Sequence, residues 1–85
     1  MTLAVAPHVT STRAADGTVL LDTRTGRYWQ MNATATLVLD HLLTGGTCRT
    51  AAEALRARHP SAGDHAEADA RALLDSLLTA RLLTP

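Results

Sequence analysis

The residues that could support catalysis are few in this chain. Cys48 and His41 have the residue types of a nucleophile and its general base, but they flank the double glycine Gly45-Gly46. No third group is placed to orient the histidine, as such a pair requires. Free cysteines are among the most buried residues, so a small buried thiol is the better interpretation of Cys48. The sequence therefore indicates no catalytic residues.

A metal site has similarly weak support. His59, Asp64 and His65 have a spacing that is loosely compatible with metal ligands. The intervening Pro-Ser-Ala-Gly predicts a loop, and no further ligands are placed to complete a coordination shell. Gly45-Gly46 follows a predicted helix rather than a strand, so it does not predict a phosphate-binding loop. We therefore expect neither a metal ion nor another cofactor.

The composition argues against two classes of partner. The 85 residues carry eight acidic and eight basic side chains, all of the latter Arg, and the formal net charge is zero. Proteins that bind nucleic acid normally show a basic surplus or stripe. No apolar run approaches the roughly 20 residues needed to cross a membrane. We expect no nucleic-acid partner and no membrane contact.

The compartment and the number of domains follow from similar observations. The single Cys48 excludes an internal disulfide, which suits a reducing compartment. The N-terminal segment lacks the positive start and the long apolar stretch of a signal peptide. At this length the chain is small enough to form one core. We expect a single domain, residues 1–85, that works in the cytoplasm.

The elements that must position any site divide the chain into two parts. Residues 5–31 are rich in β-branched residues, and segments 5–13, 18–23 and 27–31 predict three strands. The turns between them are short, which requires antiparallel pairing. After residue 32 the apolar period changes from two to about 3.6 residues, as in helices.

Three helices are expected in the second part. Asn32 is a good N-cap for the first helix, which Gly45-Gly46 ends. Thr50 and Glu53 have the spacing of a capping box at the start of the second helix, and Asp64 and Glu67 repeat that spacing at the start of the third. The predicted fold is α+β and winged helix-turn-helix-like, with a three-stranded antiparallel sheet followed by three helices.

Both large aromatic residues, Tyr28 and Trp29, lie side by side on the third predicted strand. Strand neighbours point to opposite faces, so Trp29 shares a face with Arg27 and with Met31, which we expect in the core. Trp29 should then be half-buried at the border between the sheet and the last helix. Tyr28 and Gln30 take the outer face.

Two interpretations of the exposed Tyr28 remain open. We expect it beside Leu20 or Asp22, where it could simply shield the back of a thin sheet. Alternatively, its strand is an exposed edge to which an extended peptide adds by β-augmentation.

The order of these features is similar to that of the PqqD-like family, the RiPP recognition elements. The matching residues are Asp16, Gly17, Val19, Leu20, Leu21, Asp22, Gly26, Tyr28, Trp29, Met31, Asn32 and Gly45-Gly46. The chain is most like the separate leader-binding proteins of lasso-peptide gene clusters, and the likeness extends over nearly its whole length. One departure is the first helix, where the family often has a bulky aromatic and this chain has Val38 or Leu39.

The resemblance implies a non-catalytic adaptor. It would bind the leader segment of a ribosomally synthesised precursor peptide, as an added antiparallel strand on the third strand and against the third helix. A transglutaminase-like leader peptidase of the same pathway would then receive the complex. The expected peptide-binding residues are Arg27, Tyr28, Trp29, Gln30, Met31, Asp69, Ala72, Leu73, Ser76 and Leu77.

The third helix supplies the second wall of this expected site. Asp69, Ala72, Leu73 and Ser76 follow helical spacing and form one stripe, with small residues that would leave room for a strand.

The alternative function is a winged-helix DNA-binding regulator, in which this helix would enter the major groove. Its four acidic residues would then face phosphates, which lowers affinity.

Overall fold

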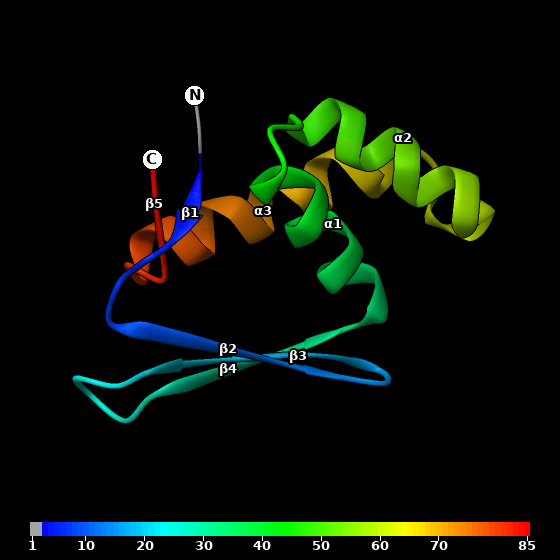
Figure 1. The fold of residues 1–85 in the computed structure, drawn as a ribbon. Helices are drawn as coiled ribbons and strands as arrows, with labels where there is room; N and C mark the ends of the chain where they lie inside the picture. The colour runs from blue at the N-terminus through cyan, green and yellow to red at the C-terminus, as the bar shows by residue number, and fades with distance from the viewer. Residues whose placement is uncertain (1–2) are drawn as a thin grey trace.

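The computed structural model describes residues 3–85 and has two layers, a three-stranded antiparallel sheet and a layer of three helices (Figure 1). The sheet comprises β2 (Val9–Ala14), β3 (Gly17–Asp22) and β4 (Tyr28–Asn32). The helices are α1 (Ala33–Leu43), α2 (Cys48–Arg58) and α3 (Ala66–Thr79), with a short 3-10 helix, Pro60–His65, before α3. The predicted α+β architecture is therefore confirmed. Within the described part of the chain, no helix is long and apolar enough to span a bilayer.

The predicted first strand, 5–13, is wrong in its extent. Pro7 interrupts it because proline has no N–H to donate, and the Val9 N–H bonds instead to the Ala6 carbonyl at 3.0 Å. The segment before this turn is a separate strand, β1 (Ala4–Val5). It pairs antiparallel with β5 (Leu83–Thr84), a strand that the sequence did not indicate.

The sheet order is β2-β3-β4, so β3 is central and β4 is an edge strand. In this register Tyr28 lies opposite Leu21, and Trp29 lies opposite Leu20. Directly opposite residues of an antiparallel pair share a face. Tyr28 and Leu21 are therefore together on the outer face, and the expectation that Tyr28 lies beside Leu20 or Asp22 is wrong. Both of those residues are buried on the inner face.

Of the three predicted N-terminal caps, only the first is confirmed. The Asn32 side chain accepts from the Ala35 N–H at 2.9 Å and starts α1. The capping box of α2 lies three residues before the expected one. Thr47 accepts from the Thr50 N–H at 3.1 Å and Thr50 accepts in return at 2.9 Å. The expected Thr50–Glu53 box is wrong because Thr47, directly after the glycine turn, already caps the helix.

The expected Asp64–Glu67 box is also wrong. Residues 60–65 form the 3-10 helix, and Gly63 breaks its regularity with φ 58° and ψ −146°. The α-helix then begins at Ala66, and His65 makes no side-chain capping bond. The acidic residues of this region therefore lie before and within the first turn without capping it.

The core fills the space between the inner face of the sheet and the helices. Leu20 of β3, Leu39 of α1 and Leu77 of α3 are at most 1% exposed and belong to one cluster. Met31 is buried in the same cluster, as expected. A Cβ atom at Gly17 would overlap the Met31 carbonyl oxygen, so glycine permits the close approach of β3 and β4.

Candidate peptide-binding site

The free edge of β4 is the first feature of the candidate site. The Asp22 N–H donates to the Arg27 carbonyl at 2.8 Å, which fixes the side of β4 that faces β3. Backbone groups alternate along an antiparallel strand, so those of Trp29 and Met31 also face β3. The N–H and C=O groups of Tyr28 and Gln30 consequently point away from the sheet. They can pair with one further strand.

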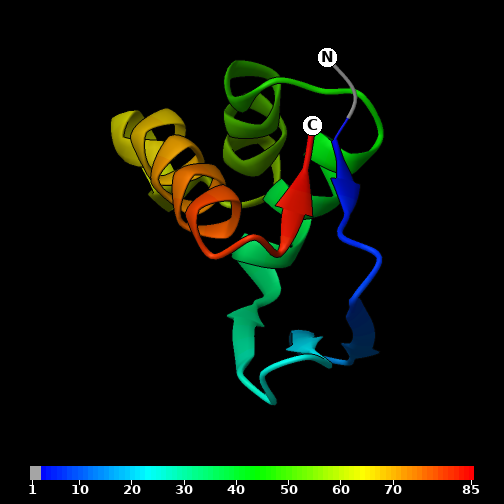
Figure 2. The same ribbon diagram turned by 90° about the vertical axis from the view of Figure 1, so that its left-hand side faces the viewer.

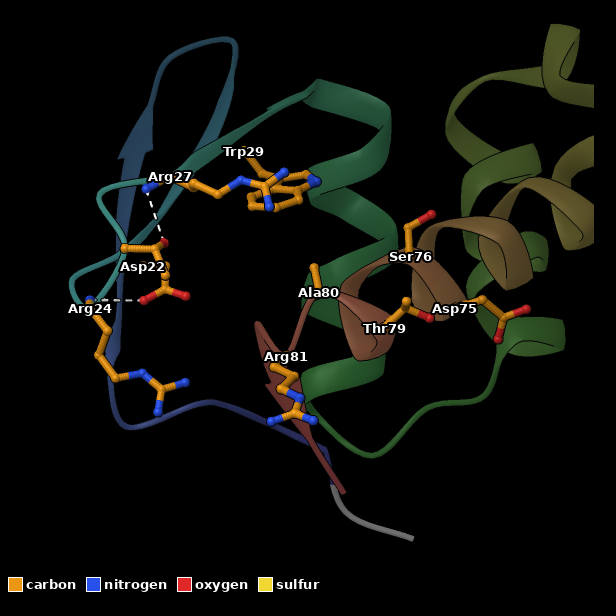
Figure 3. Close-up of a pocket in the computed structure, with 10 residues that line it drawn as sticks. Asp22, Arg24, Arg27, Trp29, Asp75, Ser76, Thr79, Ala80 and Arg81 are labelled. Atoms are coloured by element: carbon orange, nitrogen blue, oxygen red, sulfur yellow. Dashed lines mark hydrogen bonds between the residues drawn. The ribbon is translucent and has the colours of Figure 1, made fainter.

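A groove lies between this end of the sheet and the C-terminal half of α3. In Figure 2, β4 and α3 are on the same side of the molecule, and β2 is on the opposite side. The groove has a volume of about 730 Å³. Its lining residues are Asp22, Arg24, Thr25, Arg27, Trp29, Asp75, Ser76, Thr79, Ala80 and Arg81 (Figure 3).

The sheet side of the groove is built around Trp29. Its half-buried ring packs against the core cluster that contains Leu77. The Arg27 guanidinium lies 5.2 Å from the centre of the ring, within the range of a cation–π contact. This contact holds the Arg27 charge at the groove wall. The expected position of Trp29, at the border between sheet and last helix, is thus observed.

The helix side of the groove differs in part from the expected stripe. Ser76 is exposed and lines the groove. Asp69 and Ala72 are also exposed, but they lie nearer the start of α3 and are not among the groove-lining residues. Leu73 is half-buried against the core. Leu77, also expected in the site, is fully buried in the core and is not among the groove-lining residues.

The remaining lining residues were not expected from the sequence. Ser76, Thr79 and Ala80 follow i, i+3, i+4 spacing, so a longer stripe would have included the last two. Arg24 and Thr25 belong to the turn before β4. The place of Arg81 in the groove could not be predicted from the sequence, because it depends on the backbone conformation after α3.

Asp22 anchors the turn that forms the end of the groove. It accepts from the Arg24 N–H at 2.9 Å, and the His8 Nε2 atom lies 3.7 Å from its second oxygen. Burial would by itself raise the pKa of Asp22. The backbone amides of Arg24 and Thr25 and the nearby His8 and Arg24 side chains outweigh that effect, so the pKa lies below its ordinary value.

The residues first considered for catalysis and metal binding lie outside this groove. Cys48 is buried at the start of α2, as expected for a structural thiol. His41 Nε2 forms a hydrogen bond of 2.9 Å with Thr50 Oγ1. Across residues 3–85, no group of three or more His, Cys, Asp or Glu side chains is arranged to hold a metal ion.

The family follows from comparison with known proteins. The model of coenzyme PQQ synthesis protein D (PqqD) matches residues 17–83. The chain belongs to the PqqD family. The match includes β3, β4 and all of α3, so this PqqD-family chain has its groove within the shared region. Comparison with curated proteins gave no match.

Two solved structures are similar to this PqqD-family chain over nearly its whole length. Lasso peptide synthetase B1 complexed with the leader peptide is 33% identical, with 100% of both chains covered and a TM-score of 0.86. TbiB1 in complex with the TbiA(beta) leader peptide is 26% identical, with 98% of this chain and 94% of that chain covered and a TM-score of 0.74.

Asp22 gives a prediction for the pH dependence of stability. Because its folded pKa is lowered, its ionised form stabilises the fold above about pH 4, and this contribution is lost as the pH falls through the folded pKa. Asp22→Asn should lower the melting temperature at pH 7, and its difference from wild type should shrink below about pH 4. Thermal denaturation from pH 7 to pH 3 measures this difference. A difference that stays constant over that range would contradict the role of the charge.

Proposed function

We propose that this PqqD-family protein is a non-catalytic adaptor that binds the leader segment of a ribosomally synthesised precursor peptide, one that matures to a lasso peptide. The observation that carries the proposal is the free edge of β4 beside the groove under α3. Support comes from the two similar structures, because each of them is a complex with a leader peptide.

The proposed binding mode is antiparallel strand addition to β4. The outward backbone groups of Tyr28 and Gln30 would bond to the leader backbone, which gives affinity that depends little on the leader sequence. Side chains of a strand alternate between its two faces. Every second leader side chain would therefore enter the groove between Trp29 and Ser76 and give specificity.

The proposed contact residues fall into two groups. From β4 and the residue before it they are Arg27, Tyr28, Trp29, Gln30 and Met31, of which Met31 is buried in the core cluster beside Trp29. From α3 they are Ser76 in the groove, and Asp69, Ala72 and Leu73 along the continuation of the same helix. A leader that extends past the groove would reach this second set.

The adaptor would then present the bound leader to a transglutaminase-like leader peptidase in the cytoplasm.

The DNA-binding alternative has less support from the exposed side of α3. Three acidic residues, Glu67, Asp69 and Asp75, lie on this helix, and Arg71 is engaged by Glu67 at 3.0 Å. Such a surface repels phosphates.

The first prediction of this proposal concerns the edge of β4. Gln30→Pro should weaken leader binding at least tenfold, about 1.4 kcal/mol, because it removes an outward N–H without breaking the bonds to β3. Isothermal titration calorimetry with a synthetic leader peptide of a lasso precursor from the same genome measures the effect. Circular dichroism checks that the variant is folded.

Ser11→Pro is the matched control for this change. Ser11 lies in β2, the opposite edge strand, and by the same alternation its N–H also points away from β3. Leader affinity should be unchanged in this variant. Equal affinities of both proline variants and wild type would argue against strand addition on β4.

The second prediction concerns the groove. Ser76→Arg places a long side chain where leader residues would enter, and we expect at least a tenfold loss of affinity, about 1.4 kcal/mol. Ala57→Arg, on the exposed side of α2, is the control and should bind as wild type does. Both changes lie at exposed positions, so melting temperatures should change little. Wild-type affinity of Ser76→Arg would place the peptide elsewhere.

A further inference from the structure

Arg81 has an unusual backbone conformation for a residue with a side chain. Its φ is 61°, the only positive φ of a non-glycine residue among those described. The Arg81 N–H bonds to the Leu78 carbonyl at 3.0 Å and the Leu82 N–H to the Leu77 carbonyl at 2.9 Å. This is the Schellman arrangement that ends a helix, with Arg81 at the position that glycine usually occupies. Glycine adopts this conformation without strain, whereas arginine adopts it at a cost in stability.

The Arg81 side chain lines the groove together with Arg24 and Arg27 (Figure 3). Within residues 3–85, neither Arg27 nor Arg81 forms an ion pair. The Asp22 carboxylate at this end already accepts from the Arg24 N–H. Asp75, also in the lining, points away from these arginines in Figure 3. The three arginines outnumber the two carboxylates in the lining. The Asp22 charge interacts with the Arg24 side chain, and Arg27 and Arg81 have no carboxylate partner within residues 3–85.

The orientation of the bound leader determines which part of the peptide lies next to these arginines. Arg27 directly precedes β4, and Arg81 lines the same groove from the segment after α3. An antiparallel leader would have its C-terminal part at this end of β4. Guanidinium groups bind carboxylates through paired N–H donors. We propose that Arg81 and Arg27 form a carboxylate-binding site that recognises an acidic residue in the C-terminal half of the bound leader segment. This inference rests on the proposed function.

A double-mutant cycle tests the inference. The protein is wild type or Arg81→Gly, and the synthetic leader is native or has each Asp and Glu of its C-terminal half replaced by Asn or Gln. Arg81→Gly should bind the native leader at least fivefold more weakly than wild type does, and both proteins should bind the amide leader equally. The melting temperature of Arg81→Gly should equal or exceed that of wild type, because glycine adopts a positive φ without strain.

Further variants separate charge from other effects. Arg27→Gln should show the same dependence on the leader carboxylate, whereas Arg58→Gln, at the end of α2, should not. Equal loss of affinity for the native and amide leaders on Arg81→Gly, or no loss for either, would overturn the inference. A native leader without acidic residues in its C-terminal half would overturn it as well. If the leader binds wild type and Gln30→Pro weakens it, the proposed function stands whatever this cycle shows; absence of binding to wild type contradicts both.

Discussion

The structure depends on a constraint at one strand: β4 has a partner on one side only. Its bonds to β3 are fixed by the register that places Trp29 opposite Leu20. The same register leaves the backbone groups of Tyr28 and Gln30 directed outward. An edge strand of this kind must be solvated, blocked or paired. Here no segment within residues 3–85 covers it. The proposed function supplies an extended peptide as the partner of this edge.

The remaining elements hold α3 beside this edge, where the helix forms the second side of the groove. Leu77 anchors α3 in the core together with Leu20, so the helix cannot move away from the sheet without exposing apolar surface. The β1–β5 pair fixes the chain after α3, and with it the strained turn at Arg81. The core therefore holds both sides of the groove in place, and in the proposed binding mode mainly the peptide would have to become ordered.

Local patterns in the sequence predicted the layers of the fold but not its finer contacts. The change of period after Asn32 and the short turns were sufficient for the three-stranded sheet and three helices. Pairing of β1 with β5 joins segments of two residues each from opposite ends of the chain, and so short a strand carries no periodicity. Alternation and helical spacing singled out Trp29 and Ser76, which both line the groove. Leu77 was also expected to contact the peptide but is buried in the core, because a residue list does not fix how a helix is rotated. The position of the Arg81 side chain depends on a positive φ, a conformation that arginine rarely adopts, so the sequence did not indicate it.

Amide hydrogen exchange at single-residue resolution tests strand addition to β4 most directly. In the free protein the Tyr28 and Gln30 amides should exchange fast, and the Trp29 and Met31 amides, bonded to β3, should exchange slowly. With saturating leader peptide, exchange at Tyr28 and Gln30 should slow about tenfold or more as their N–H groups become bonded. Fast exchange at both positions in the presence of bound leader would contradict the account.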